Sequence, residues 1–212
     1  MINRKTLSEQ AYIEFTRMIM NRKFSPGEKI TEERIAKMLG VSRTTVKKVF
    51  TALEKEGILV AIPRKGVFLR KYTKEEILEI FDLRTVVAEL AIKYAVLNVN
   101  KKDIAYLEAI YKKMEEAVNN NDTKKYSEYD RELHESIVRF SGTSILPDII
   151  SNLYLRLRPF AQLNIRDPRE TIKEHKEIVE SIKAGDPERA GKAMREHILK
   201  AKEYVDLHRF NI

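Results

Sequence analysis

The sequence predicts a mainly α-helical protein, with an N-terminal winged helix-turn-helix followed by an all-α antiparallel helical bundle. Three observations support this fold class. The first 72 residues contain short helical segments and then two short apolar runs around a Pro and Gly turn. From residue 73 onward, apolar residues recur at helical spacing and no convincing strand interrupts them. The excess positive charge lies entirely in the first part.

Charge divides the chain into two parts. The 212 residues are enough for two small domains, each with its own core. Residues 1–72 hold 16 Lys and Arg against 7 Asp and Glu, a net charge of +9. Residues 73–212 hold 24 against 25, a net charge of −1. This segregation is typical of a nucleic-acid-binding domain joined to a neutral one. A membrane-surface patch is the alternative, but the first segment lacks a suitable aromatic amphipathic face.

Composition also narrows the classes of protein and site. The chain contains no cysteine, so disulfides and thiolate metal sites are excluded. No long apolar run or signal-like N-terminus is present, and we therefore expect a soluble cytoplasmic protein without membrane partners.

Two helices are expected before the central motif. Helical spacing begins near Thr6, and the first helix should end before the turn signature Ser25-Pro26-Gly27. Its inward stripe consists of Tyr12, Phe15 and Ile19. Thr31 then caps a short second helix that ends at Gly40.

Ser42 is a good N-cap for the next helix, which reads as the second helix of a helix-turn-helix. At about 100° per residue, one side carries Val46, Val49, Phe50 and Leu53, and the other carries Thr44, Lys47, Lys48 and Thr51. Arg43 lies in the first turn. Cations and small hydroxyls on one face suit phosphates and base edges in a DNA major groove. An ordinary surface helix is the alternative interpretation.

A change of pattern after Gly57 predicts a β-hairpin. The apolar runs 58–62 and 67–69 flank Pro63-Arg64-Lys65-Gly66. With Arg64 and Lys65 at its tip, the hairpin looks like a wing that enters a minor groove or touches the DNA backbone. A solvated loop is the alternative.

The second part should form six helices at roughly residues 74–98, 101–119, 122–140, 144–165, 168–184 and 187–208. Turn residues separate them, and Asp167-Pro168 and Asp186-Pro187 each combine an N-cap with Pro at the first helical position. Short connections of this kind favour an antiparallel bundle.

Asp130 and His134 stand four residues apart, which places both side chains on one helix face. A carboxylate and an imidazole side by side form half of a site for zinc, nickel or a similar ion. A simple surface hydrogen bond is the alternative. His175 and His197 lie on separate later helices near apolar residues, and bundles build metal sites from facing helices. Spacing alone does not show that these helices converge.

Residues 6–70 resemble the winged helix of the GntR family of bacterial transcription regulators. The resemblance rests on the Ser-Pro-Gly turn followed by Leu39-Gly40-Val41-Ser42-Arg43-Thr44, Leu53-Glu54-Lys55-Glu56-Gly57 and Arg64-Lys65-Gly66-Val67-Phe68. It implies that Gly66 lets the wing backbone come close to DNA and that the operator is approached by Arg43, Thr44, Thr45 and Lys47. Lys48, Arg64 and Lys65 complete the expected DNA-binding set.

This part also departs from the family pattern. Many relatives carry Pro at the position of Thr45 and Arg-Glu at the positions of Lys47-Lys48, and another operator-contacting Arg would fall on Glu33. Lysine contacts phosphate but lacks the bidentate fork that arginine offers guanine. No operator sequence can therefore be transferred from the family.

Residues 73–212 resemble the FCD domain that follows the winged helix in one large branch of the family. Its Asp-x-x-x-His motif and two later histidines match Asp130, His134, His175 and His197. The resemblance implies a divalent metal with open positions for a carboxylate ligand, and zinc or nickel is the natural expectation. Arg84 matches an arginine that holds an effector carboxylate, although a salt bridge to a neighbouring acid is as plausible. Relatives usually carry Glu where this chain has Ala88.

We therefore expect a homodimeric, sequence-specific transcription regulator, a repressor that a small organic acid controls at a metal site. Two alternatives remain. A metal-dependent hydrolase could use the basic domain as a DNA tether, but no additional acid or base stands at an assignable spacing. A direct metal sensor would respond to the ion itself.

Overall fold

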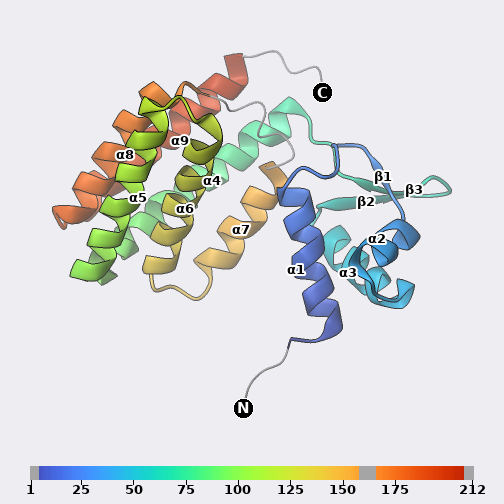
Figure 1. Cartoon of the computed structure of the whole chain (residues 1–212). Coiled ribbons are helices and arrows are strands. Elements are labelled where there is room, and N and C mark those ends of the chain that lie inside the picture. The colour runs from blue at the N-terminus through green and yellow to red at the C-terminus, as the bar shows by residue number, and fades with distance from the viewer. Residues whose placement is uncertain (1–4, 158–165, 208–212) are drawn as a thin grey trace. The chain divides into compact units, whose positions relative to one another are not determined.

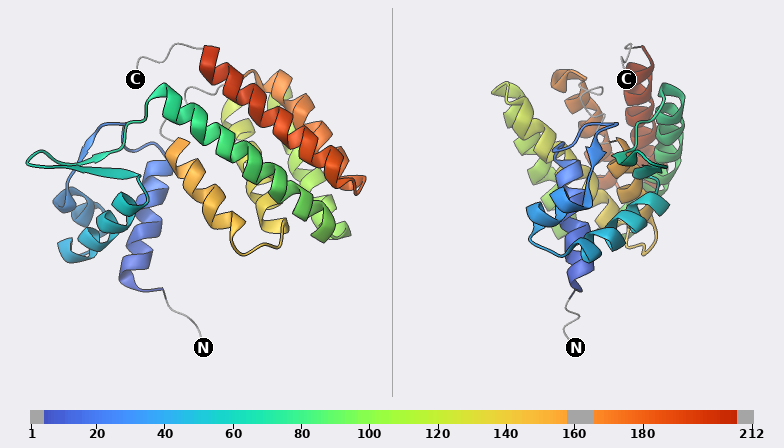
Figure 2. Two further views of the ribbon diagram at one scale, coloured as in Figure 1. Left: turned by 180° about the vertical axis from the view of Figure 1, so that it is seen from behind. Right: turned by 90° about the vertical axis from the view of Figure 1, so that its right-hand side faces the viewer.

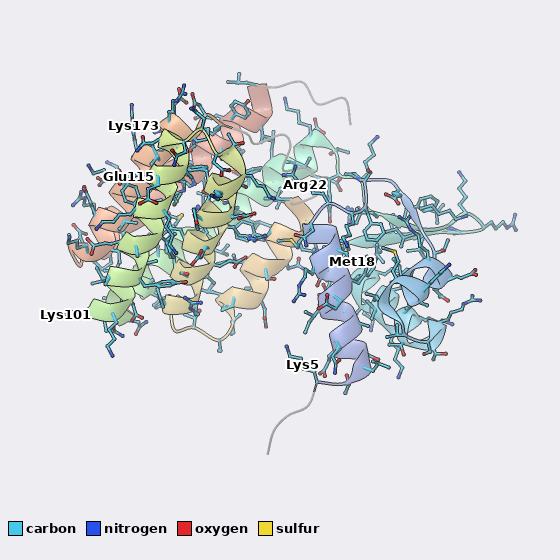
Figure 3. The ribbon with its side chains drawn as sticks, in the orientation of Figure 1. Lys5, Met18, Arg22, Lys101, Glu115 and Lys173 are labelled. Atoms are coloured by element: carbon cyan, nitrogen blue, oxygen red, sulfur yellow. The ribbon has the colours of Figure 1, made fainter. Side chains whose placement is uncertain are left out.

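The computed structural model describes residues 5–157 and 166–207. It confirms a mainly α-helical protein with a small β-sheet in its N-terminal part (Figure 1). These residues form two compact units, one made of 5–73 with 152–157 and the other of 74–151 with 166–207. Each unit, drawn with its side chains in Figure 3, buries its own set of apolar residues.

The first two helices begin at the predicted caps, and each ends before the predicted turn. α1 (Leu7–Met20) follows Thr6, which closes a capping box at the helix N-terminus. α2 (Glu32–Leu39) is capped by Thr31 and ends at Gly40, whose φ of 66° lies in the left-handed region. Glycine adopts this conformation without the strain that a Cβ would cause, so the chain can turn sharply toward the next helix.

α3 (Arg43–Lys55) is the predicted recognition helix. Ser42 caps it, because its hydroxyl accepts a hydrogen bond of 3.2 Å from the Thr45 backbone N–H. The predicted inward face is buried, and it consists of Val46, Val49, Phe50 and Leu53. The opposite face is left to cations and hydroxyls.

The wing belongs to a three-stranded antiparallel sheet in the order β1-β3-β2. β2 (Leu59–Ile62) and β3 (Gly66–Leu69) form the predicted hairpin. β1 (Lys29–Ile30), which the sequence pattern did not predict, adds to the other edge of β3. Two residues are too few to show the alternation that marks a strand, so β1 depends on its pairing with β3.

Aromatic packing forms the centre of this unit. The Phe15 ring contacts Phe24 edge-on, with 5.5 Å between centroids, and stacks on Phe50 at 5.7 Å. Apolar residues of the three helices and the sheet surround these rings. The core thereby fixes the orientation of α3, whose outer face remains exposed.

The second unit consists of helices whose boundaries follow the turn residues of the sequence. The helices are α4 (Lys74–Asn98), α5 (Lys101–Asn119), α6 (Thr123–Phe140), α7 (Leu146–Leu157), α8 (Pro168–Lys183) and α9 (Pro187–Leu207). The last residues of α7 group with the first unit. The predicted continuations to residues 165 and 208 lie outside the described residues.

Helix pairing builds the bundle around one interior. α4 and α9 run side by side (Figure 2), and α5 packs against both α6 and α8. α8 also packs against α9, and α4 against α6. Within the part of the chain that the structure describes, no helix has the length and apolar character needed to cross a lipid bilayer.

Candidate functional site

Asp130 and His134 lie on the inward side of α6. The buried face of this helix includes Tyr126, Leu133, His134 and Ile137, which recur at helical spacing. Asp130 lies at the rim of that face, with its side chain 35% exposed. The same periodicity that packs α6 into the bundle therefore aims a carboxylate and an imidazole at the interior.

The two later histidines reach the same place. His175 Nε2 lies 3.0 Å from Asp130 Oδ1 and 3.4 Å from His134 Nε2. The His197 ring centroid lies 5.2 Å from that of His134 and 4.6 Å from that of His175. One nitrogen or oxygen from each of the four residues lies within 4.8 Å of all the others. The structure thus brings together all four predicted ligands, from α6, α8 and α9.

The interior keeps two of these imidazoles neutral near pH 7. All three histidines are at least nine-tenths buried. Burial lowers the pKa of His134 well below its usual value, despite the opposing charge of Asp130. Burial and the neighbouring His175 lower the pKa of His197 to about 4. A neutral imidazole offers the lone pair that a metal requires.

Asp130 is ionised in the same surroundings. Burial would raise the pKa of this carboxyl, but the hydrogen bond with His175 and the nearby imidazoles outweigh it. The pKa of Asp130 therefore falls well below its ordinary range. The cluster combines one anionic oxygen donor with three nitrogen donors.

This donor set fits a divalent cation. A metal about 2.1 Å from each ligand separates neighbouring ligand atoms by roughly 3.0–3.4 Å. The measured separations of 3.0, 3.4 and 3.8 Å among Asp130, His134 and His175 lie close to that range. Three imidazoles and one carboxylate also leave positions open on a six-coordinate ion, and imidazole and carboxylate donors suit zinc or nickel.

Tyr126 lies behind His175, one turn before Asp130 on α6. Its hydroxyl lies 3.1 Å from His175 Nδ1 and 2.7 Å from Thr171 Oγ1. Burial raises the pKa of Tyr126 far above its ordinary value, so the phenol remains protonated. It supports the imidazole on the side away from the cluster.

Arg84 of α4 is buried close to the cluster. Its guanidinium lies over the Phe81 ring, 5.8 Å from the centroid. Its charge is one of the influences that lower the pKa of His134, after burial and the charges of the other histidines. The predicted effector-binding arginine is therefore within electrostatic range of the predicted metal ligands.

The predicted DNA-contacting side of α3 is exposed. The Arg43 side chain is 70% exposed, and its Nη2 lies 3.8 Å from Glu32 Oε2. Thr44, Lys47 and Lys48 are also exposed. Thr45 is half-buried, and its hydroxyl lies 2.9 Å from that of Ser42.

The wing tip presents its two cations at a tight turn. Arg64 and Lys65 are exposed, and the Lys65 backbone N–H donates to the Ile62 carbonyl at 3.0 Å. Gly66 has a φ of 115°, where a side chain would be strained. The turn geometry therefore requires the glycine that the sequence supplies.

Several partners of the cluster were not predicted. Tyr126 could have been found, because it stands four and eight residues before the two α6 ligands on the same helix face. Glu174 is a further partner, and the structure places its Oε2 2.8 Å from His197 Nδ1. Arg166 and Glu174 form a two-contact ion pair. No spacing connects α8 with α9, so this contact had no sequence signal.

Comparisons with known proteins confirm the family resemblance of both parts of the chain. Residues 7–69 match the model of bacterial regulatory proteins of the gntR family, and residues 79–200 match that of the FCD domain. The uncharacterized HTH-type transcriptional regulator YdhC of Bacillus subtilis (strain 168) is 30% identical over 90% of this chain and 85% of its own length. The HTH-type transcriptional repressor RspR of Escherichia coli (strain K12) is 20% identical over 94% of this chain and 89% of its own length.

Solved structures share the fold. E. coli McbR/YncC has a TM-score of 0.82 at 22% identity, covering 95% of this chain and 98% of that one. The metal-free FCD domain of TM0439, a regulator by its description, has a TM-score of 0.54 at 20% identity, covering 64% of this chain and 94% of its own. These families consist of transcription regulators and not enzymes. The chain belongs to the GntR family of DNA-binding transcription regulators, in the branch that carries an FCD domain.

Proposed function

We propose that this regulator is a homodimeric repressor whose affinity for its operator is controlled by a small organic acid bound at a divalent metal site. Residues 1–72 form the DNA-binding domain, and residues 73–212 form the domain that binds metal and effector. Zinc and nickel are the favoured ions, because the donor set is three imidazoles and one carboxylate.

One observation carries this proposal. Asp130, His134, His175 and His197 come from three helices, yet their donor atoms meet within 4.8 Å in the interior of the bundle. Burying three imidazoles around a partly buried carboxylate without a partner ion is costly. We infer that a metal compensates this cost and that the site was selected for binding rather than for packing.

The neighbouring cation indicates the class of effector. A bound divalent ion supplies an electrophilic centre for carboxylate oxygens. Arg84 offers a planar guanidinium suited to a second carboxylate contact. Arg84 is close enough to the cluster for its charge to contribute to the lowered pKa of His134. A small organic acid held by both groups is the ligand class that this arrangement favours.

The DNA-binding domain supplies two kinds of contact. Arg43, Thr44, Thr45 and Lys47 read or approach bases in the major groove, and Lys48 holds phosphate. Arg64, Lys65 and Gly66 bring the wing to the minor groove or backbone. The exposed cations of α3 and the wing tip support these roles.

An apolar stripe on α4 supports the homodimer. Its inner face is buried, yet five large side chains on the outer face are at least 42% exposed: Leu83, Val86, Leu90, Tyr94 and Leu97. Their spacing of three and four residues places them on one side of the helix. A helix that is apolar on both faces requires a partner on each. A second copy, which presents the same stripe across a two-fold axis, fits this requirement.

The proposal is tested by an unbiased DNA selection with purified full-length protein, followed by affinity measurements on the selected duplex. Binding is measured with Zn²⁺ or Ni²⁺, with a chelator, and with a panel of small organic acids at fixed metal. We expect sequence preference in all conditions and a change in affinity with one acid only when metal is present. A change with metal alone would favour a direct metal sensor, and no preference among duplexes would refute the proposal.

A further inference from the structure

Glu174 contacts the Nδ1 atom of His197. The His197 Nδ1 to Glu174 Oε2 distance is 2.8 Å. Both side chains are about nine-tenths buried, with exposed fractions of 8% for His197 and 11% for Glu174. Such a contact is short enough for a charge-assisted hydrogen bond.

The chemistry of the carboxylate decides which ring nitrogen carries the proton. An ionised carboxylate only accepts hydrogen bonds, whereas a neutral imidazole has one donor nitrogen and one acceptor nitrogen. Contact with Glu174 therefore requires the hydrogen of His197 on Nδ1. The lone pair is then on Nε2, the form needed for a metal at that nitrogen.

His175 provides an internal contrast. Its Nδ1 contacts the Tyr126 hydroxyl at 3.1 Å, and a hydroxyl can both donate and accept. Its Nε2 contacts the ionised Asp130 at 3.0 Å, so in the metal-free protein the hydrogen of His175 is held on Nε2, and the Tyr126 hydroxyl donates to Nδ1. His197 therefore differs from His175, because its acceptor-only partner holds the hydrogen on Nδ1 and leaves Nε2 free for a metal, whereas the partner of His175 holds the hydrogen on Nε2.

Glu174 is itself held in place by two cations. Arg166 donates to both carboxylate oxygens, with distances of 2.8 Å from Nη1 and 2.6 Å from Nη2. Lys200 Nζ, one turn after His197 on α9, lies 3.2 Å from Oε1. The side chain of Arg166 is only 10% exposed. Bidentate pairing fixes the plane of the carboxylate as well as its charge.

We propose that Glu174 is a positioning residue for the metal site, which it preorganises by holding His197 as the Nδ1–H tautomer while Arg166 holds Glu174. This inference rests on the proposed function in that His197 is taken as a metal ligand. Glu174 itself binds no metal and takes no part as a base. Outer partners of this kind usually change metal affinity by roughly 10- to 100-fold.

The test compares four variants of the full-length protein. Glu174→Ala removes the acceptor. Glu174→Gln keeps the shape but removes the charge, and its amide NH2 group cannot accept a hydrogen bond from Arg166. Glu177→Ala is the matched control, because Glu177 lies on the same helix and its Oε1 is 2.7 Å from Arg189, but it does not contact the cluster. Arg166→Gln tests the support of the carboxylate.

Two measurements are made on each variant. Competition with a chromophoric chelator gives the dissociation constant for Zn²⁺, and ¹⁵N chemical shifts of the histidine rings in metal-free protein give the tautomers. We expect a roughly 10- to 100-fold weaker Zn²⁺ affinity in Glu174→Ala and smaller losses in Glu174→Gln and Arg166→Gln. The His197 ring should carry its proton on Nδ1 in the parent and lose this preference in Glu174→Ala. Glu177→Ala should match the parent in both.

An open groove of about 500 Å³ reaches Glu174, His197 and Arg166, and it allows a rescue experiment with a small carboxylate. Formate should enter the space left in Glu174→Ala and restore part of the Zn²⁺ affinity, with no gain in the parent or in Glu177→Ala. A parent ring protonated on Nε2, or unchanged affinity in both Glu174 variants, would overturn the inference. If the parent binds neither Zn²⁺ nor Ni²⁺, the proposed metal site fails, whereas the tautomer measurement still decides the role of Glu174.

Discussion

Asp130 Oδ1 lies 3.0 Å from His175 Nε2, although the two side chains come from different helices, α6 and α8. This contact ties the rim of the cluster to its most deeply buried imidazole. Asp130 is also the only anion among the four candidate ligands in the described residues. Its removal is therefore the most direct test of the metal site.

We expect Asp130→Ala to weaken zinc binding about 100-fold. Zinc sites with four ligands bind with roughly 10–16 kcal/mol, so one ligand contributes about 3 kcal/mol, or about a hundredfold in affinity. Calorimetric titration with Zn²⁺ and Ni²⁺ measures the loss. Glu135→Ala serves as the control, because Glu135 is an exposed carboxylate on the same helix with its side chain 65% exposed. Equal affinity of the two variants would contradict the site.

Arg84→Gln should separate effector binding from metal binding. Loss of a charged hydrogen bond to a carboxylate costs roughly 1.5–3 kcal/mol, so the effect of the organic acid on operator affinity should require at least tenfold more acid. Zn²⁺ affinity should be retained, because Arg84 acts on His134 through charge and donates no metal ligand. An unchanged acid requirement would remove Arg84 from the effector site.

The metal-free protein should lose stability as pH falls from about 6.5 to about 4. The pKa of His197 is about 4 in the folded state and about 6.5 in the unfolded state. Between these values the unfolded chain binds more protons, so the free energy of unfolding falls as pH decreases. At about 1.4 kcal/mol per pKa unit, the loss amounts to about 3 kcal/mol. His134 shifts in the same direction and adds to it.

Thermal unfolding in the presence of a chelator, recorded across this pH range, measures the effect. His197→Asn should flatten the profile, because asparagine does not titrate. A profile of the parent that is already flat between pH 6.5 and 4.5 would show that His197 is not held neutral by burial.

Arg43→Ala and Lys48→Ala should weaken DNA binding in different ways. Loss of a base contact at Arg43 should cost about 1–3 kcal/mol on the preferred duplex and relax discrimination. Loss of a phosphate contact at Lys48 should weaken binding to all duplexes alike. It should also reduce the slope of log affinity against log salt concentration by about 1. Fluorescence anisotropy over a salt series, with Lys55→Ala at the exposed end of α3 as control, separates the two. Equal losses on every sequence would refute this division.

A charge in the α4 stripe should break the homodimer. Burial of an unpaired carboxylate costs on the order of 3–5 kcal/mol, so Val86→Asp or Leu90→Asp should shift sedimentation from dimer to monomer. Leu207→Asp is the control, because Leu207 is 80% exposed and lies outside the stripe. A monomeric parent, or stripe variants that remain dimeric, would exclude this surface as the contact.

Helices and turns of this chain were predictable because their signals are local. The N-caps Ser42 and Asp167, and the C-terminal Gly40, fix helix ends within the residues that carry them. β1 was missed because a two-residue strand exists only through its pairing with β3. Local signals therefore determined most of the element boundaries.

The site was predictable in part. Spacing on one helix joined Asp130 to His134, and family resemblance added His175 and His197. Contacts between helices, such as Glu174 with His197, depend on packing that no spacing encodes. The outer apolar face of α4 was also missed, because a helix that is apolar all round gives no contrast between its two faces.

The three imidazoles occupy positions that leucine or isoleucine would fill in an ordinary bundle, since α6, α8 and α9 each bury their histidine within an apolar row. An ion bound there would join the three helices near their middles. Its binding should therefore slow amide hydrogen exchange along all three together. The organic acid would then bind to an interior that the ion has already stiffened, and not to a mobile loop.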